Sequence, residues 1–246
     1  NIYNRLYKHI HYGTFQINNK TTFFEFLNTI SYPSKYLNKI TIVEGWNAYQ
    51  LNDLLKKNFN YYQDLSYLDV IADTYLINQY SNFYKFRDFL KKNKDNLISK
   101  YSNHNLLKKF NFNEIMVIAS LVEKEGIDYE DKKKISSVIF NRLNKKMKLQ
   151  IDATVIYSIT KGKHKFTRSL TRNDLKIKDI YNTYYINYLP PKPICYVGTK
   201  TIELIFENYN SDYLYYFYDK NKKKHDFSKS YSEHLIKLNE YRKKNK

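Results

Sequence analysis

Apolar residues recur at helical spacing near the start of the chain. Four of them follow the i, i+3, i+4, i+7 pattern of an amphipathic helix: Phe23, Phe26, Leu27 and Ile30. Thr21 or Thr22 is a suitable N-cap for this helix. We expect one short strand before it, at Tyr12, Phe15 and Ile17, and a second strand after it over residues 40–43.

Residues 48–110 predict helices that are interrupted by one turn. The expected turn is Asp73–Tyr75. In the later part of the segment, four apolar residues repeat at helical spacing, which is typical of core packing: Phe83, Phe86, Phe89 and Leu90.

The clearest helix of the sequence covers residues 111–126. Asn111 is a good N-cap, and Glu114 three residues later completes a capping-box pattern. One face of this helix carries four apolar residues: Ile115, Ile118, Leu121 and Val122. Both observations predict a largely buried helix.

A further helix should begin after Asp128, which can cap it. Its inward positions are Ile135, Val138, Ile139 and Leu143. After residue 147 the pattern changes to short extended pieces and turns, with a strand over 214–218 and a closing helix over 232–243. The elements together predict an α+β fold.

Composition adds a strong positive charge to this picture. The 246 residues carry a formal net charge of +18, which suggests an anionic partner such as nucleic acid, anionic lipid or an acidic polymer. Asn, Lys, Ile and Tyr are abundant, as an AT-rich genome encodes, so codon bias with a solvated surface is the alternative. The lysines are scattered through the chain.

Three features bear on the compartment. Cys195 is the single cysteine, so an intrachain disulfide is impossible. No window approaches the 18 consecutive apolar residues that indicate a membrane span. The chain begins at Asn1 rather than Met, so we expect a fragment or processed form from which a leader or anchor is missing.

Two carboxylates near the end of helix 111–126 are candidates for chemistry. Glu123 and Glu125 are two residues apart, so they point about 200° apart around the helix. Glu125 continues the apolar face, whereas Glu123 falls on the side of Met116 and Ser120. A carboxyl among apolar neighbours has a raised pKa, and the negative end of the helix dipole acts in the same direction.

Such a carboxyl suits a general acid that works near neutral pH. The alternative is a solvated Glu at a frayed helix end.

Three polar residues alternate with apolar ones shortly afterwards. Gln150, Asp152 and Thr154 alternate with Ile151 and Val155. In an extended strand they would share one face, which suits hydrogen bonding to a sugar. The alternative is a half-exposed strand without a ligand.

An aromatic segment and a proline-rich segment come next. Tyr181–Tyr184 precedes the run Leu189–Ile194, which holds three of the four prolines and is therefore rigid. Aromatic rings beside a rigid loop suit stacking on a sugar, and the alternative is a structural loop wall.

Several other chemistries lack the residues they require. The six histidines and the single cysteine show no zinc-binding spacing. Glycine is too scarce for a phosphate-binding loop, and no nucleophile elbow is present. We therefore expect no metal and no cofactor.

Taken together, the motifs resemble the endolytic murein (peptidoglycan) lytic transglycosylases, the MltG/YceG-like family. Five blocks fall in the family's order: 118–125; 138–143; 147–157; 181–184 with 189–191; and 213–215 with His225 and Phe227. Weaker blocks lie upstream at 13–15, 43–45 and 73–75. The chain departs from the family at several positions: Gly126 where Thr or Ser is usual, Ala72 and Ala153 for Pro, and Lys146 and Tyr188 for Gly.

The resemblance implies a small LysM-like βααβ subdomain over residues 1–47, followed by a mixed α/β catalytic domain over 48–246. It implies Glu125 as the catalytic residue, with Glu123 as the alternative. The substrate-binding candidates that accompany it are Gln150, Asp152, Thr154, Tyr181, Asn182 and Tyr184. One carboxyl suffices in this family because the nucleophile is a hydroxyl of the substrate.

The implied activity is cleavage of the MurNAc–GlcNAc bond within glycan strands, which leaves 1,6-anhydro-MurNAc ends. The implied partners are peptidoglycan strands, the membrane through a missing N-terminal anchor, and the cell-wall synthesis machinery. The implied place is the periplasmic (outer) face of the cytoplasmic membrane. Two alternatives stay open: a non-catalytic peptidoglycan-binding relative, and an RNA-binding protein suggested by the charge and the 27 tyrosines. No nucleic-acid motif supports the second, and we expect no nucleic-acid partner.

Overall fold

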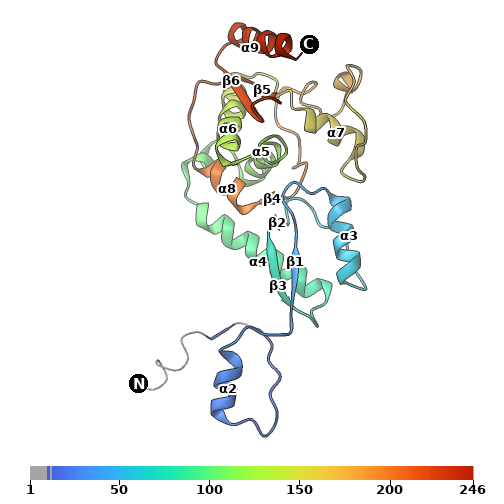
Figure 1. Ribbon diagram of the computed structural model, residues 1–246, viewed down its shortest axis with the longest axis vertical. Coiled ribbons are helices and arrows are strands. Elements are labelled where there is room, and N and C mark those ends of the chain that lie inside the picture. Colours follow the sequence, from blue (N-terminus) through green and yellow to red (C-terminus); the bar gives the residue numbers. More distant parts are fainter. Residues whose placement is uncertain (1–9, 12, 246) are drawn as a thin grey trace. The chain divides into compact units, whose positions relative to one another are not determined.

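The computed structural model describes residues 10, 11 and 13–245. These residues form two compact units. The first contains the described residues up to Thr41 together with Thr74–Phe89, and the second contains Ile42–Asp73 together with the described residues from Leu90 onward. Figure 1 gives the order of the elements along the chain. Helices and small two-stranded sheets are mixed in it, which confirms an α+β fold.

The first unit contains the helix α2, Phe23–Ile30, and an antiparallel pair of strands. Thr22 caps α2, and Glu25 completes a capping box with it. β1, Leu37–Thr41, pairs with β3, Thr74–Asn78, from Leu37 opposite Asn78 to Thr41 opposite Thr74. The strand expected at Phe15 and Ile17 is wrong, since neither residue is in a strand, and Tyr12 lies outside the described residues.

The segment 48–110 is less helical than its pattern predicts. It holds α3, Ala48–Asn58, and α4, Phe83–Tyr101. The expected turn at 73–75 is wrong because strands flank Asp73 directly, β2 at Ile71–Ala72 and β3 after it. β2 pairs in parallel with β4, Val197–Gly198, so its partner lies far away in the sequence.

The second unit carries the helices around the candidate site. Their bounds are α5 Phe112–Glu125, α6 Tyr129–Asn144, α7 Asp152–Thr160, α8 Thr199–Phe206 and α9 Tyr231–Lys244. Two short 3₁₀ segments accompany them, η1 Asn105–Lys108 and η2 Asp174–Lys176. The capping predictions for α5 and α6 are confirmed: Asn111 and Glu114 form a capping box, and the Asp128 side chain accepts from the N–H of Asp131.

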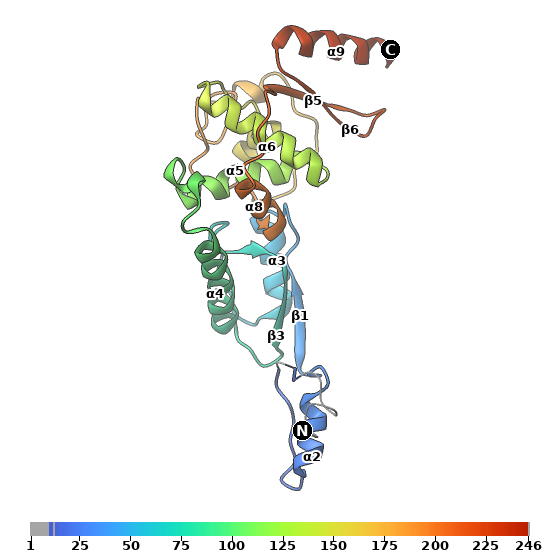
Figure 2. The ribbon, with the colours of Figure 1, turned by 90° about the vertical axis from the view of Figure 1, so that its left-hand side faces the viewer.

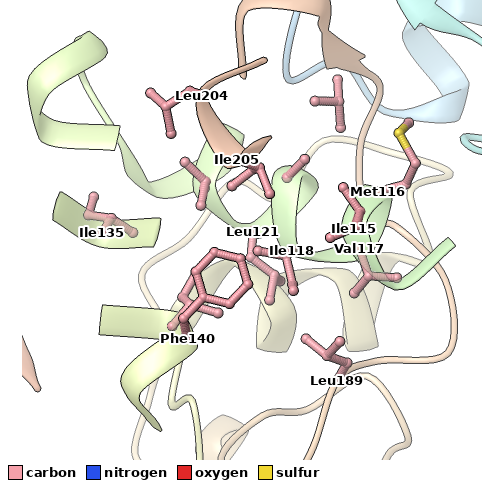
Figure 3. Close-up of a cluster of buried hydrophobic side chains, with 14 of the residues drawn as sticks. Ile115, Met116, Val117, Ile118, Leu121, Ile135, Phe140, Leu189, Leu204 and Ile205 are labelled. Carbon is pink, nitrogen blue, oxygen red and sulfur yellow. The ribbon is translucent and has the colours of Figure 1, made fainter. Parts of the chain in front are cut away.

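The hydrophobic core of this unit is built around α5, which packs against α6 and α8. Eight consecutive residues of α5, from Ile115 to Val122, are buried. Figure 3 shows Ile118 and Leu121 of α5 facing Phe140 of α6, with Ile205 of α8 beside them. Each large apolar side chain buried here stabilises the fold by about 1.5 to 3 kcal/mol, so the end of α5 is held on a rigid support.

A hairpin and a closing helix complete the unit (Figure 2). β5, Tyr215–Asp219, pairs antiparallel with β6, Lys224–Ser228, and α9 packs on both strands. The predicted strand and closing helix near the C-terminus are confirmed. Among the described residues, no helix has both the length and the apolar character needed to cross a membrane.

Candidate active site

Glu125 is the last residue of α5, and its half-buried side chain meets two other elements. The hydroxyl of Tyr216 on β5 donates a hydrogen bond to Oε2 of Glu125 at 3.1 Å. The backbone N–H of Ala153, in the first turn of α7, faces the same carboxylate and lowers its pKa. That N–H is one of the donors that a helix leaves unpaired at its N-terminus. The carboxyl is therefore held in place by groups from β5 and α7.

The pKa of Glu125 is raised above its ordinary value. Burial is the main cause, and the charge of Asp152 acts in the same direction. The hydrogen bonds from Tyr216 and Ala153 and the neighbouring His225 lower the pKa, but they do not outweigh burial. A carboxyl in this state keeps its proton to higher pH than an ordinary Glu, as a general acid requires.

Tyr216 is suited to donate to this carboxylate. Burial raises the pKa of the Tyr216 phenol well above its ordinary value, and the charge of Glu125 raises it further. The phenol is therefore neutral at physiological pH and carries the proton that the hydrogen bond needs.

Glu123 points to a different part of the protein, but it does not face solvent as an outward helix position would. Its side chain is 3% exposed and forms an ion pair with Lys132 of α6. Its Oε2 accepts a hydrogen bond from the backbone N–H of Gly198 at 3.3 Å. Because both carboxylate oxygens are already bonded to the protein, Glu123 has the character of a structural ion pair.

Asp152 lies near enough to Glu125 for its charge to raise the pKa of that carboxyl. Asp152 is the first residue of a helix, whereas the sequence predicted a strand. The expected strand with Gln150, Asp152 and Thr154 on one face is wrong, because α7 begins at Asp152. Asp152 is exposed, and the Tyr184 hydroxyl donates to its Oδ1 at 2.7 Å. The pKa of Tyr184 is raised mainly by burial, and the charges of Asp152 and Glu125 both raise it further. The structure therefore brings Glu125, Asp152 and Tyr184 together.

Two other candidates, Thr154 and Asn182, are fully buried and bonded to the protein. The hydroxyl of Thr154 lies 2.9 Å from that of Thr183 and accepts from the Thr183 N–H at 3.1 Å. The Asn182 amide donates to the carbonyls of Leu175 and Ile177, and its oxygen accepts from the Tyr184 N–H at 2.9 Å. These contacts fasten segment 181–184 onto α7 and so hold Tyr184 near Asp152.

The remaining candidates lie at the edges of this arrangement. Gln150 is exposed with a left-handed backbone, φ 53°, and its N–H donates to the carbonyl of Thr183 at 3.1 Å. The half-buried ring of Tyr181 packs against Tyr157 with ring centres 4.7 Å apart. Their role in binding a substrate stays a prediction.

Arg142 is an organising residue to which sequence reasoning gave no role. It is 8% exposed, and its guanidinium donates to the carbonyls of Leu214 at 2.7 Å and Leu149 at 2.8 Å. It also lies over the ring of Tyr215, 5.3 Å from the centroid. Arg142 thus joins α6 to the start of β5 and to the segment before α7. The available signal in the sequence was an Arg that falls on the buried face of an amphipathic helix.

The chain is 38% identical over 143 residues, 58% of its length, to an endolytic murein transglycosylase of Bacillus subtilis. It is 33% identical over 174 residues, 66% of its length, to an endolytic murein transglycosylase of Streptococcus pneumoniae. These matches span 38% and 31% of the two relatives, so the chain covers about a third of their length.

A solved structure has the same fold. It is the crystal structure of a YceG-like protein from Listeria monocytogenes, 28% identical to this chain, with a TM-score of 0.65. The likeness covers 80% of this chain and 75% of that one. The description of the YceG-like family matches residues 1–240, and the chain belongs to that family.

Proposed function

We propose that this chain is an endolytic lytic transglycosylase that cleaves the MurNAc–GlcNAc bond within peptidoglycan strands. The observation that carries the proposal is the Glu125 carboxyl, which has a raised pKa and is held by Tyr216 beside Asp152 and Tyr184. The names of the relatives from Bacillus subtilis and Streptococcus pneumoniae support the same reaction.

The reaction needs one residue that both gives and takes a proton. Neutral Glu125 donates its proton to the glycosidic oxygen as the bond from C1 of MurNAc to that oxygen breaks. The C6 hydroxyl of the same MurNAc then attacks C1, and its proton passes to the Glu125 carboxylate. A 1,6-anhydro ring forms, no water is consumed, and Glu125 returns to its acid form.

This scheme differs from common glycoside hydrolysis. Most glycosidases use two carboxylates, one as acid and one as nucleophile or base. Here the substrate supplies the nucleophile, so Asp152 is assigned an electrostatic and orienting role. Gln150, Thr154, Tyr181, Asn182 and Tyr184 are proposed to form or support the surface that binds the glycan.

Digestion of purified sacculi tests the proposal. We expect the chain to release muropeptides with 1,6-anhydro ends, identified by mass spectrometry as lighter by one water than hydrolase products. Endolytic cleavage should release long oligosaccharides early in the digest. Glu125→Gln serves as the inactive control. Sacculi that are bound but not cleaved would favour the alternative of a non-catalytic peptidoglycan-binding relative.

The same proposal covers the surroundings of the enzyme. We place its action in the cell envelope, at the outer face of the cytoplasmic membrane, with an N-terminal anchor outside this chain and with the cell-wall synthesis machinery as a partner. The net charge of +18 supports association with anionic peptidoglycan and anionic lipid.

The LysM-like character of residues 1–47, with the catalytic domain over 48–246, belongs to the proposal as well. A pocket of about 570 Å³ in the first unit supports a sugar-binding role for these residues. Its lining combines rings with amide and hydroxyl groups, which suits a sugar: Phe15, Tyr32 and Tyr36 with Gln16, Asn28 and Thr29.

A further inference from the structure

A second pair of titratable side chains is buried beside the Glu125 site. Asp131 lies in the first turn of α6 and His225 on β6, and their side chains are 7% and 8% exposed. Nδ1 of His225 lies 2.8 Å from Oδ2 of Asp131. The reaction scheme above uses neither residue, although both lie in elements that adjoin Glu125.

The Asp131 carboxylate holds two parts of the chain at once. Its Oδ2 accepts the hydrogen bond from His225 and another at 3.1 Å from the backbone N–H of Ile127. Burial acts to raise the pKa of Asp131, but these hydrogen bonds outweigh it and the pKa is lowered. Asp131 is therefore an ionised acceptor, and Nδ1 of His225 is the donor. Ile127 comes two residues after Glu125, so Asp131 fixes the backbone that follows the candidate acid.

His225 continues the connection toward the carboxyl of Glu125. In the β5–β6 register, Tyr218 is opposite His225 and Tyr216 is opposite Phe227, so Tyr216 is a diagonal neighbour of His225 on one face of the hairpin. The rings of Tyr216 and His225 stand at 89° with centres 5.3 Å apart. Tyr216 in turn donates to Glu125. The position of the Tyr216 hydroxyl thus depends on where His225 holds the hairpin.

These contacts form a continuous series that leads away from Glu125 and returns to it. One side runs along the backbone to Ile127 and Asp131, and the other runs through Tyr216 and His225. We infer that Asp131 and His225 are positioning residues, which lock the β5–β6 hairpin onto the loop after α5 and so place the Tyr216 hydroxyl on the Glu125 carboxyl. This inference rests on the proposed function for its catalytic meaning, but the geometry it describes can be measured without substrate.

Two substitutions of His225 separate the hydrogen bond from the charge. The amide nitrogen of Asn lies two bonds beyond Cβ, as Nδ1 of His does, so His225→Asn can still donate to Asp131. The amide nitrogen of Gln lies three bonds beyond Cβ, at the place of Nε2, so His225→Gln loses the bond. Both replacements are neutral. Asp226→Asn is the matched control, because Asp226 is on the same strand and pairs with the exposed Lys222 at 2.6 Å.

The decisive measurement is the titration of the Glu125 carboxyl by NMR on ¹³C-labelled chain, with Glu125→Gln to assign the signal. The Tyr216 bond lowers the pKa of Glu125, so its loss should raise that pKa. We expect Tyr216→Phe and His225→Gln each to raise it and the double variant to match His225→Gln. His225→Asn should raise it less than His225→Gln does, because it loses only the charge of His225, which lowers the pKa of Glu125. Asp226→Asn should leave it at the wild-type value.

Three results would overturn the inference. His225→Gln could titrate like wild type, His225→Asn could shift as far as His225→Gln, or the two shifts could add in the double variant. If His225→Gln does not fold, Asp131→Asn replaces it. Loss of a negative charge by itself would lower the pKa of Glu125, whereas loss of positioning raises it, so an unchanged or lowered pKa also counts against the inference.

Turnover on sacculi is the second readout. His225→Gln should lower kcat by about 10- to 100-fold with KM nearly unchanged, because the acid is misplaced while binding persists. His225→Asn should restore most of kcat. If wild-type chain releases no anhydro-muropeptides, the proposed function fails, and the NMR titration still decides whether Asp131 and His225 place Tyr216.

Discussion

Lys132 of α6 forms an ion pair with the Glu123 carboxylate, which is 3% exposed. Glu125 follows Glu123 by two residues on α5, and its carboxyl faces the uncharged phenol of Tyr216 and the backbone N–H of Ala153. The first environment is a structural ion pair, and the second raises the pKa of the carboxyl, mainly through burial. About half a turn of α5 thus separates a structural carboxyl from a candidate catalytic one.

Glu125→Gln should abolish release of anhydro-muropeptides, by about 10² to 10⁴ in rate or more, because an amide neither donates nor accepts the transferred proton. Glu123→Gln should keep most activity but cost about 1 to 3 kcal/mol of stability, since it leaves Lys132 without its partner. Turnover on the same sacculi and urea unfolding of both variants give the comparison. An inactive Glu123→Gln beside an active Glu125→Gln would reverse the assignment.

Stability should depend on pH through Glu125. Its folded-state pKa is raised, so the stability contributed by the neutral acid is fully present below the unfolded pKa and is lost as pH rises through the folded pKa. Glu125→Gln should therefore be more stable than wild type at about pH 8 and no more stable near about pH 4.5. Chemical unfolding at both pH values checks this, and equal stability at high pH would contradict burial of the charge.

Asp152→Asn should shift the alkaline limb of the kcat/KM profile to lower pH. Burial is the main reason for the raised pKa of Glu125, but the Asp152 charge adds to it, and the amide removes that charge while its oxygen still accepts from Tyr184. The exposure of Asp152 keeps the shift modest. Asp212→Asn, an exposed carboxylate paired with Lys229, is the control. A collapse of kcat with an unmoved limb would instead give Asp152 a direct role on the substrate.

Gly126→Ala should destabilise the fold by about 1 to 3 kcal/mol and lower activity. A Cβ at Gly126 would overlap the side chain of Lys132 and lie 3.0 Å from its Cα, which displaces the partner of Glu123 beside the site. Gly45→Ala is the comparison: its φ of +77° strains an alanine, but no atom lies within 4 Å. Gly45→Ala should lose stability and keep its activity per folded molecule. Thermal unfolding and turnover of both variants test this difference.

Binding to sacculi should weaken as salt rises, because screening reduces the attraction between a +18 chain and anionic peptidoglycan. Co-sedimentation of the Glu125→Gln variant with sacculi measures binding without digestion. Binding that stays the same from low to high salt would leave codon bias as the better explanation of the charge.

The sequence by itself determined α5 and α6, the two helices that flank the Glu125 loop. The capping box of Asn111 and Glu114 and the apolar period of α5 are local properties, as is the start of α6 at Asp128. The same periodicity separated Glu125 from Glu123, because positions two residues apart on a helix point in nearly opposite directions. Neighbours along the chain decide these features, so the pattern predicts them.

The tertiary structure decided what surrounds Glu125. Tyr216 is one of several similar aromatic residues in a strand, and only the fold of the β5–β6 hairpin brings its hydroxyl to the carboxyl. The same is true of β1, whose partner β3 follows a long intervening segment. The segment with Asp152 alternates like a strand yet forms a helix. Its short polar–apolar run fits both periods, and packing against Thr183 settles which one forms.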